Sequence, residues 1–263
     1  MARVTRFAPS PTGPLHLGHA FAALTAAERG DRFLVRIEDI DRTRCRAAHE
    51  AGIFRDLYWL GLRWEEPVLR QSERGQVYVQ AIDRLTKNGL TYHCTCTRAD
   101  IRTAQSAPQG AEGAIYPGTC RDAGHQTGAL RLNIAKATAD LPDLDFLDAG
   151  RRHRFNPHQL EQTLGDVVLA RRDIGVAYHL AVVVDDAFQG ITEVTRGEDL
   201  LPATAFQVTL HHLLGLPVPH YHHHRLICDD RGKRLAKRDD ARALAKFRAE
   251  GATPDDIRRL VGL

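Results

Sequence analysis

The spacing of apolar residues over the first ninety positions predicts alternating strands and helices. Apolar runs predict strands at Val4–Ala8 and Arg32–Asp39, with a helix between them from about Leu15 to Arg29. Apolar positions at the helical period then predict helices over Arg46–Leu62 and Gln71–Asn88, the second ending at a glycine. This order is typical of the first half of a nucleotide-binding α/β unit.

The pattern changes from Thr91 to about Gly175. A loop rich in Gly, Ala, Pro and Gln spans roughly Thr103 to Gly118, and loops longer than about 12 residues are usually functional or disordered. We interpret 91–175 as an insertion between two halves of a parallel sheet. Its strand-like runs are Ala129–Ile134, Phe146–Phe155 and Gly165–Arg171.

The α/β pattern resumes at Tyr178–Asp186, a nearly continuous apolar run that ends in acids and predicts a central parallel strand. The later elements expected are strands at Ile191–Asp199 and Tyr221–Ile227 and helices at about Leu201–Leu214, Ala241–Glu250 and Pro254–Leu263. Four segments follow: 1–90 and 176–228 as the halves of the α/β domain, 91–175 as the insertion, and 229–263 as a basic loop with a helical tail.

Three consecutive histidines lie on the last predicted strand. Side chains alternate across a strand, so His222 and His224 should face one side and His223 the other. They therefore do not converge on a metal, and exposed or phosphate-facing imidazoles are favoured.

Composition narrows the class of protein. The 263 residues carry a formal net charge of +3, a mild excess that does not by itself identify a nucleic-acid binder. No apolar run approaches the roughly 20 residues of a membrane helix, and the N-terminus lacks the layout of a signal peptide, so a cytoplasmic protein is expected. Five cysteines in such a chain favour reduced thiols or metal ligation over disulfides.

The turn after the first strand is the richest in candidate chemistry. Prolines and a glycine break the strand before the helix, for which we expect Thr12 or Gly13 near the cap and Pro14 in the first turn. A strand that turns sharply into a helix directs backbone N–H groups at one spot, which suits a phosphate. His16 and His19 should share one helix face there.

This stretch resembles the HIGH signature of class I aminoacyl-tRNA synthetases, here His16-Leu17-Gly18-His19. The longer string Arg-Phe-Ala-Pro-Ser-Pro-Thr-Gly-x-Leu-His-x-Gly-His, from Arg6 onward, resembles the glutamate-specific branch. A second stretch, Arg234–Arg238, resembles the KMSKS signature. It departs from that consensus at Arg234, Ala236 and Arg238, but keeps Lys237, a cation suited to the leaving phosphates.

The resemblance implies a Rossmann-like parallel sheet split by a zinc-containing α+β subdomain, with ATP and Mg²⁺ as the substrate complex. The implied nucleotide-binding residues are Pro9, Gly18, His19 and Lys237, and the catalytic ones are His16, His19 and Lys237. The implied pocket for L-glutamate consists of Arg6, Ser10, Glu38, Tyr178 and Arg196. Of these, Glu38 is expected at the ammonium and Arg196, with Tyr178, at the side-chain carboxylate.

A structural zinc site is expected in the insertion. Cys94, Cys96 and Cys120 supply three thiolates, whereas a closed zinc site has four ligands. The residues alone leave the fourth ligand open among His93, Tyr116, Asp122 and His125. The resembling branch follows its Cys-x-Cys with Tyr-x-x-x-Cys, and this pattern implies Tyr116.

About 25 residues follow the second signature, fewer than the roughly 50 of an independent domain, so no anticodon-binding domain is expected. The resemblance is therefore to the truncated branch, the glutamyl-queuosine tRNA(Asp) synthetases. It implies activation of glutamate without tRNA and transfer to queuosine in the anticodon of tRNA(Asp). The alternatives are a minimal glutamyl-tRNA synthetase that charges tRNA(Glu) and a non-catalytic, synthetase-like binding protein.

Overall fold

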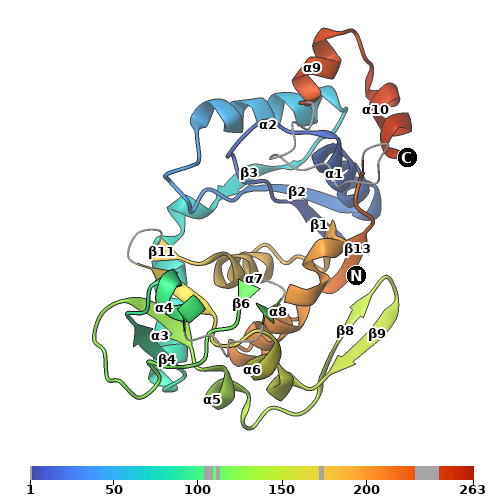
Figure 1. Cartoon of the computed structure of the whole chain (residues 1–263). Coiled ribbons are helices and arrows are strands. Elements are labelled where there is room, and N and C mark those ends of the chain that lie inside the picture. The colour runs from blue at the N-terminus through green and yellow to red at the C-terminus, as the bar shows by residue number, and fades with distance from the viewer. Residues whose placement is uncertain (1, 104–108, 111–112, 172–174, 229–242) are drawn as a thin grey trace. The chain divides into compact units, whose positions relative to one another are not determined.

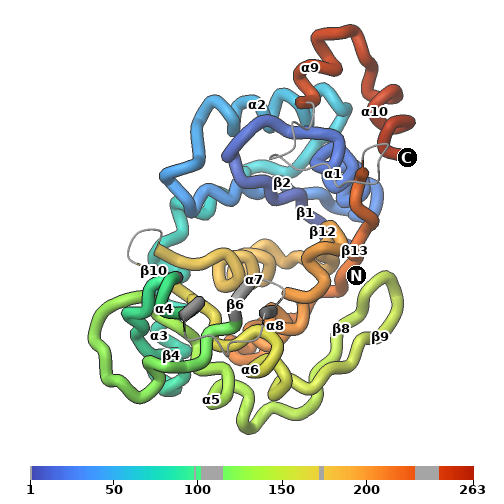
Figure 2. Tube along the Cα trace, viewed as in Figure 1, coloured from blue at the N-terminus to red at the C-terminus, as the bar shows by residue number. Residues whose placement is uncertain are grey.

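The computed structural model describes residues 2–103, 109–110, 113–171, 175–228 and 243–263. The chain forms two compact units, each built from separate stretches of sequence. The first unit combines residues 1–73, 190–201 and 219–263, and the second combines residues 74–189 and 202–218. Figure 2 traces the chain through both.

The first unit is a parallel α/β structure. Strands β1, β2 and β3 form one parallel sheet in that order, and β12 pairs in parallel with β13 (Figure 1). Its elements are β1 (Val4–Phe7), α1 (Leu17–Arg29), β2 (Arg32–Ile37), α2 (Ala47–Trp59), β3 (Glu65–Arg70), η1 (Gln71–Glu73), β12 (Glu193–Gly197), η3 (Glu198–Leu200), β13 (His220–His224), α9 (Leu244–Ala249) and α10 (Pro254–Val261).

The core of this unit forms where α1 packs on β1 and on α10. Strand β2 is buried on both faces except at its first residue, as expected of a parallel strand covered by helices. The first residue of strand β1, Val4, is hydrogen-bonded to Thr192, which directly precedes β12. The backbone N–H of Val4 donates to Thr192 Oγ1 at 2.8 Å, and the N–H of Thr192 donates to the Val4 carbonyl at 3.0 Å.

The second unit is built on an antiparallel sheet of order β11-β10-β7-β4. Helix α3 packs against α7 beside this sheet, and β8 pairs with β9 as an antiparallel hairpin. The elements are α3 (Gly75–Lys87), β4 (Thr91–Cys94), α4 (Arg98–Thr103), β5 (Gln109–Gly110), β6 (Gly113–Ala114), β7 (Ala129–Leu132), α5 (Ile134–Thr138), β8 (Leu144–Asp148), β9 (Arg151–Phe155), η2 (Pro157–Gln159), α6 (Leu160–Thr163), β10 (Val168–Arg171), β11 (Gly175–Val176), α7 (Tyr178–Phe188) and α8 (Leu201–Leu213).

Three sequence-based expectations about local structure are wrong. Tyr178–Asp186 is not a strand but most of helix α7, in which His179 to Asp186 are all buried. A helix buried on every side has no polar face, so its sequence reads like a central strand. Phe146–Phe155 is not one run but the hairpin of β8 and β9, which turns at Ala149 and Gly150 with φ values of 47° and 82°.

The third error concerns the start of α1. The helix begins at Leu17 with His16 as its N-cap, so neither Thr12 nor Gly13 is the cap and Pro14 lies outside the helix. Proline disfavours the α conformation in the residue before it, so Gly13 cannot easily open a helix. None of the described helices combines the length and apolar character that a membrane span requires.

Candidate active site and cysteine cluster

The two histidines of the first signature cap α1 together. The Gly18 N–H donates to His16 Nδ1 at 3.2 Å, and the His16 N–H donates to His19 Nδ1 at 3.2 Å, which closes a capping box. The ring centroids lie 3.8 Å apart. Because each Nδ1 accepts a hydrogen bond, each neutral ring keeps its proton on Nε2, a donor suited to an anionic oxygen.

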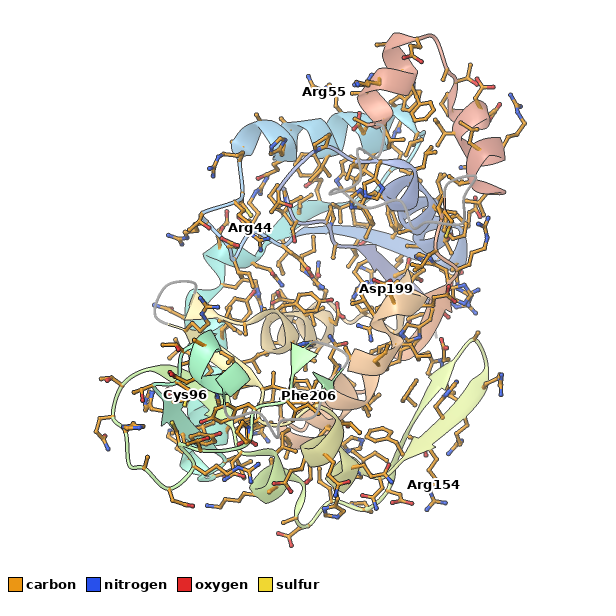
Figure 3. All side chains as sticks on the ribbon, viewed as in Figure 1. Arg44, Arg55, Cys96, Arg154, Asp199 and Phe206 are labelled. Carbon is orange, nitrogen blue, oxygen red and sulfur yellow. The ribbon has the colours of Figure 1, made fainter. Side chains whose placement is uncertain are left out.

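A pocket opens at this end of α1. Gly197 limits its shape, since a Cβ there would lie 2.4 Å from Asp199 Oδ1 and 3.0 Å from Leu226 Cδ2. Asp199, which lines this pocket, is labelled in Figure 3. The lining residues are His16, Gly18, His19, Phe21, Ala22, Gly197, Asp199, Leu200, His224, Arg225, Leu226 and Ile227.

Both flanks of the second signature reach this part of the first unit. Leu226 and Ile227 line the pocket on one side. On the other, Ala243 forms a bridge with His16, and the Leu244 N–H donates to the Leu15 carbonyl at 2.9 Å. Lys237 itself lies outside the described residues.

Three of the residues expected to bind glutamate are buried charges in the first unit. The exposed fractions of Arg6, Glu38 and Arg196 are 5%, 8% and 6%. Arg6 Nη1 donates to the carbonyl of Thr195 at 3.3 Å, which brings β1 beside the residue that precedes Arg196. The Glu38 N–H donates to the Pro9 carbonyl at 3.1 Å and ties the acid to the first signature.

The other two residues expected in this pocket differ in setting. Ser10 is exposed, and its carbonyl accepts the Thr12 N–H at 2.8 Å. Tyr178 is half-buried as the first residue of α7, in the second unit. In charge, a ligand with two carboxylates and one ammonium complements two arginines and one acid.

Two further residues with charged or polar side chains lie at this site and were not predicted from the sequence. Arg36 is completely buried and donates from Nη2 to Glu38 Oε1 at 3.1 Å. His223 accepts a hydrogen bond from Arg196. Arg36 lies on β2 two residues before Glu38, which directly follows the strand, and this spacing is the signal that could have identified it.

His224 also lines the pocket, and its ring makes an edge-to-face contact with Phe21. Burial lowers the pKa of His224 below its ordinary value, although a hydrogen bond to the Arg225 carbonyl opposes this. The ring is therefore neutral at pH 7. Because Nδ1 lies 2.9 Å from the Arg225 carbonyl, it carries the proton of the neutral ring.

The three cysteines of the insertion converge in the second unit, where Figure 3 labels Cys96. The sulfur atoms of Cys94, Cys96 and Cys120 lie within 4.8 Å of one another. Cys96 Sγ and Cys120 Sγ are 3.5 Å apart. Tetrahedral zinc with Zn–S bonds of about 2.3 Å requires sulfurs about 3.8 Å apart, so the cluster fits a zinc ion with little adjustment.

The hydroxyl of Tyr116 completes this cluster. It lies 3.6 Å from Cys96 Sγ and accepts the Cys120 N–H at 2.9 Å. Among the described residues, no histidine or acid has a ligand atom in the group. His125 instead contacts Thr95 Oγ1, at 3.3 Å.

Burial and mutual hydrogen bonding give the residues of this cluster different pKa values. Burial raises the pKa of the Cys96 thiol to about 11 and raises that of Tyr116 further above its ordinary value. Burial also acts to raise the pKa of Cys120. Hydrogen bonds from the Tyr116 hydroxyl and the Thr95 backbone outweigh it, so the pKa of Cys120 falls to about 6. A thiolate at Cys120 provides one anionic ligand at neutral pH.

The parallel sheet, the histidine-capped helix and its pocket together define a class I synthetase catalytic domain. The family model described as "tRNA synthetases class I (E and Q), catalytic domain" matches residues 3–263. The glutamyl-Q tRNA(Asp) synthetase of Rhodobacter capsulatus is 56% identical over 99% of this chain and 100% of its own length. That of Nocardia farcinica is 45% identical over 97% of this chain and 82% of its own length. The chain therefore belongs to the glutamyl-Q tRNA(Asp) synthetase family of the class I synthetases.

Solved structures agree on the fold. A glutamate tRNA ligase from Elizabethkingia meningosepticum, in complex with its amino acid, superposes with a TM-score of 0.75 at 27% identity. The match covers 100% of this chain and 61% of that one. The ligase from Elizabethkingia anophelis gives a TM-score of 0.77 at 26% identity and the same coverage. This chain thus spans about three fifths of the length of both ligases.

Proposed function

We propose that this protein activates L-glutamate with ATP, without tRNA, and transfers the glutamyl group to queuosine in the anticodon of tRNA(Asp). The observation that carries the proposal is the burial in the first unit of Arg6, Glu38 and Arg196, two cations and one anion of the kind that bind the carboxylates and the ammonium of glutamate; Glu38 also pairs with Arg36. The names of the relatives support queuosine-bearing tRNA(Asp) as the acceptor. Such an enzyme would act in the cytoplasm, where tRNA is found.

Activation requires little acid–base chemistry. The α-carboxylate of glutamate is already an anion at neutral pH and can attack the α-phosphorus of ATP directly. The protein needs to align the two reactants and stabilise charge on the phosphates. The Nε2 groups of His16 and His19, the start of α1 and Lys237 are the proposed donors. Bound Mg²⁺ would neutralise part of the pyrophosphate charge.

In the proposed pocket, different residues bind the ammonium group and the two carboxylates of glutamate. Glu38 binds the ammonium through a charge-assisted hydrogen bond. Arg196, with Tyr178, binds the side-chain carboxylate, for which the planar guanidinium provides bidentate geometry. Arg6 serves either carboxylate, and Ser10 completes the pocket.

We also propose that Cys94, Cys96, Tyr116 and Cys120 hold a structural zinc ion. The support is the convergence of three sulfurs and one hydroxyl from separate stretches of the second unit. Four protein ligands leave no open position, so the ion would cross-link the fold rather than take part in the reaction.

Two assays test the proposed activity. Exchange of pyrophosphate into ATP with glutamate and no tRNA should be measurable, and its absence would favour a non-catalytic binding protein. Transfer of labelled glutamate should occur with queuosine-bearing tRNA(Asp). It should be lost with unmodified tRNA(Asp) and with tRNA(Glu). Charging of tRNA(Glu) would instead establish a minimal glutamyl-tRNA synthetase.

A further inference from the structure

One buried carboxylate stands at the centre of the contacts around the cysteine cluster. The side chain of Asp166 is completely buried and lies in the segment between α6 and β10. It is not part of the cysteine group itself. Its carboxylate nevertheless has partners beside Cys94 and Cys120, as well as the backbone N–H of Ile134 at 2.8 Å, and its backbone segment lies next to Tyr116.

The first contact is to the strand that ends in Cys94. The hydroxyl of Tyr92, two residues earlier on β4, donates to Asp166 Oδ2. The Tyr92 ring also packs against the apolar side of the cysteine cluster.

The second contact is to the residue that follows Cys120. Arg121 donates from Nε to Asp166 Oδ2 at 2.7 Å and from Nη2 to Oδ1 at 2.9 Å, in a bidentate pair. Arg121 Nη1 reaches Glu161 at 2.6 Å, but that carboxylate is 43% exposed. Exposed ion pairs contribute little, whereas removing one member of a buried pair is costly.

The third contact runs through the backbone of Asp166 to Tyr116. Arg131 Nη1 donates to the Asp166 carbonyl at 2.7 Å, and the Arg131 guanidinium lies 3.9 Å from the Tyr116 ring centroid. Gly165 bridges Tyr116 directly, at a φ of 72°. A Cβ on Gly165 would lie 2.9 Å from the Tyr116 carbonyl oxygen, so the two backbones approach closely.

We propose that Asp166 is the positioning residue of the metal site: it holds the segments of Cys94, Cys120 and Tyr116 in register for one ion. The inference rests on the proposed zinc site. Outer partners that orient metal ligands typically change metal affinity about 10–100-fold when they are removed. Loss of the carboxylate would free Tyr92 and Arg121 together, and the ligands on both sides would lose their alignment.

The test uses zinc release from the full-length protein to an excess of a chromogenic chelator. Asp166→Asn keeps the shape but removes the charge, and we expect zinc release about 10–100-fold faster than from wild type. Tyr92→Phe removes one hydrogen bond, and a smaller acceleration is expected. Glu161→Gln is the matched control, because it removes the exposed partner of the same Arg121, and its release rate should stay within about threefold of wild type.

A second readout separates positioning from general loss of stability. With Co²⁺ in place of zinc, Asp166→Asn should change the visible ligand-field bands, whereas Glu161→Gln should leave them unchanged. Wild-type release rates and spectra in a folded Asp166→Asn would overturn the proposal. If Asp166→Asn does not fold, a wild-type release rate in Tyr92→Phe would overturn it. Freshly purified wild type without zinc would instead refute the zinc site on which the inference rests.

Discussion

Arg196 and His223 face each other across two neighbouring parallel strands. They are register partners on β12 and β13, and Arg196 Nε donates to His223 Nε2 at 3.1 Å. The His223 ring also stacks on Tyr221, with an interplanar angle of 7°. This bond fixes the direction of the guanidinium, so a proposed substrate contact depends on an imidazole that does not itself need to touch glutamate.

Replacing His223 should therefore weaken glutamate binding. His223→Ala should raise the KM for glutamate about tenfold and change kcat much less, because only ground-state orientation is lost. His223→Gln offers another acceptor to Arg196 and should recover part of the effect. His220→Ala, at an exposed position on the same strand, is the control in pyrophosphate exchange. A fall in kcat as large as the rise in KM would argue for a merely structural role.

Removing the guanidinium itself should be more severe. Arg196→Ala should raise the glutamate requirement by about 100-fold or more, since a bidentate contact to a carboxylate is lost. Arg196→Lys keeps the charge but not the bidentate geometry, and its KM for glutamate should lie between those of wild type and Arg196→Ala. The KM for ATP serves as the internal control and should stay near its wild-type value. Unchanged glutamate kinetics would remove Arg196 from the pocket.

Two ion pairs made by arginines of β2 allow the effect of burial to be compared with that of distance. Arg36 and Glu38 are 3.1 Å apart with exposed fractions of 0% and 8%, whereas Arg32 and Glu65 are 2.6 Å apart with fractions of 52% and 44%. Arg36→Met should lower the free energy of unfolding by about 3–5 kcal/mol because it leaves a buried acid. Arg32→Met should have a much smaller effect, because its ion pair is exposed to solvent. Urea unfolding measures both, and the reverse order would show that distance matters more than burial.

His211 should make stability fall in acid. Burial lowers the pKa of this histidine to about 4, although Asp186 and a bond to the Pro217 backbone oppose the shift. The unfolded chain, with a histidine pKa near 6.5, then binds the extra proton between pH 6.5 and 4. Stability is therefore complete above about pH 6.5 and decreases by about 3 kcal/mol as the pH falls to 4.

The measurement is urea unfolding across this pH range for wild type and for His211→Gln. The difference between the two proteins cancels the shared titration of carboxylates. We expect the variant to have a shallower acid dependence. If the two curves of unfolding free energy against pH are parallel, His211 binds its proton equally well in the folded and unfolded protein.

Tyr116→Phe tests the fourth zinc ligand. The change keeps the ring beneath Arg131 but removes the oxygen that lies 3.6 Å from Cys96 Sγ. We expect zinc affinity to fall at least tenfold in competition with a chelator, because one of four ligands is lost. Tyr58→Phe, at a ring 62% exposed, is the control. Unchanged zinc affinity in Tyr116→Phe would assign the fourth position to another group.

Sequence reasoning identified the parts of this fold that local pattern determines. Strands β1 and β2, helices α1, α2 and α3, the strand of histidines and the convergence of the cysteines follow from periodicity, turn residues and ligand spacing. Strand β3, between α2 and α3, was not predicted. Helix α7 was missed because its three consecutive valines favour strands, while burial on all sides removes the helical period. Tertiary packing decides such a segment.

Partners from distant parts of the sequence could not be predicted either. Nothing local to Asp166 indicates that it meets Tyr92 and Arg121, 74 and 45 residues away. The bond between Arg196 and His223 likewise depends on strand register, which one sequence does not fix. The pocket at α1 was expected, and the histidines of the last strand were expected to be exposed or to face a phosphate, but the edge-to-face contact of His224 with Phe21 was not predicted.

The link between β1 and the start of β12 also has a consequence for biosynthesis. Val4 donates to a residue 188 positions later in the chain. At about 5–20 residues per second, the ribosome delivers that partner about 10–40 s after the first strand emerges. During this interval one edge of the nascent sheet stays open to pairing with other polypeptides, so we expect chaperone occupancy to be concentrated on the earliest part of the growing chain.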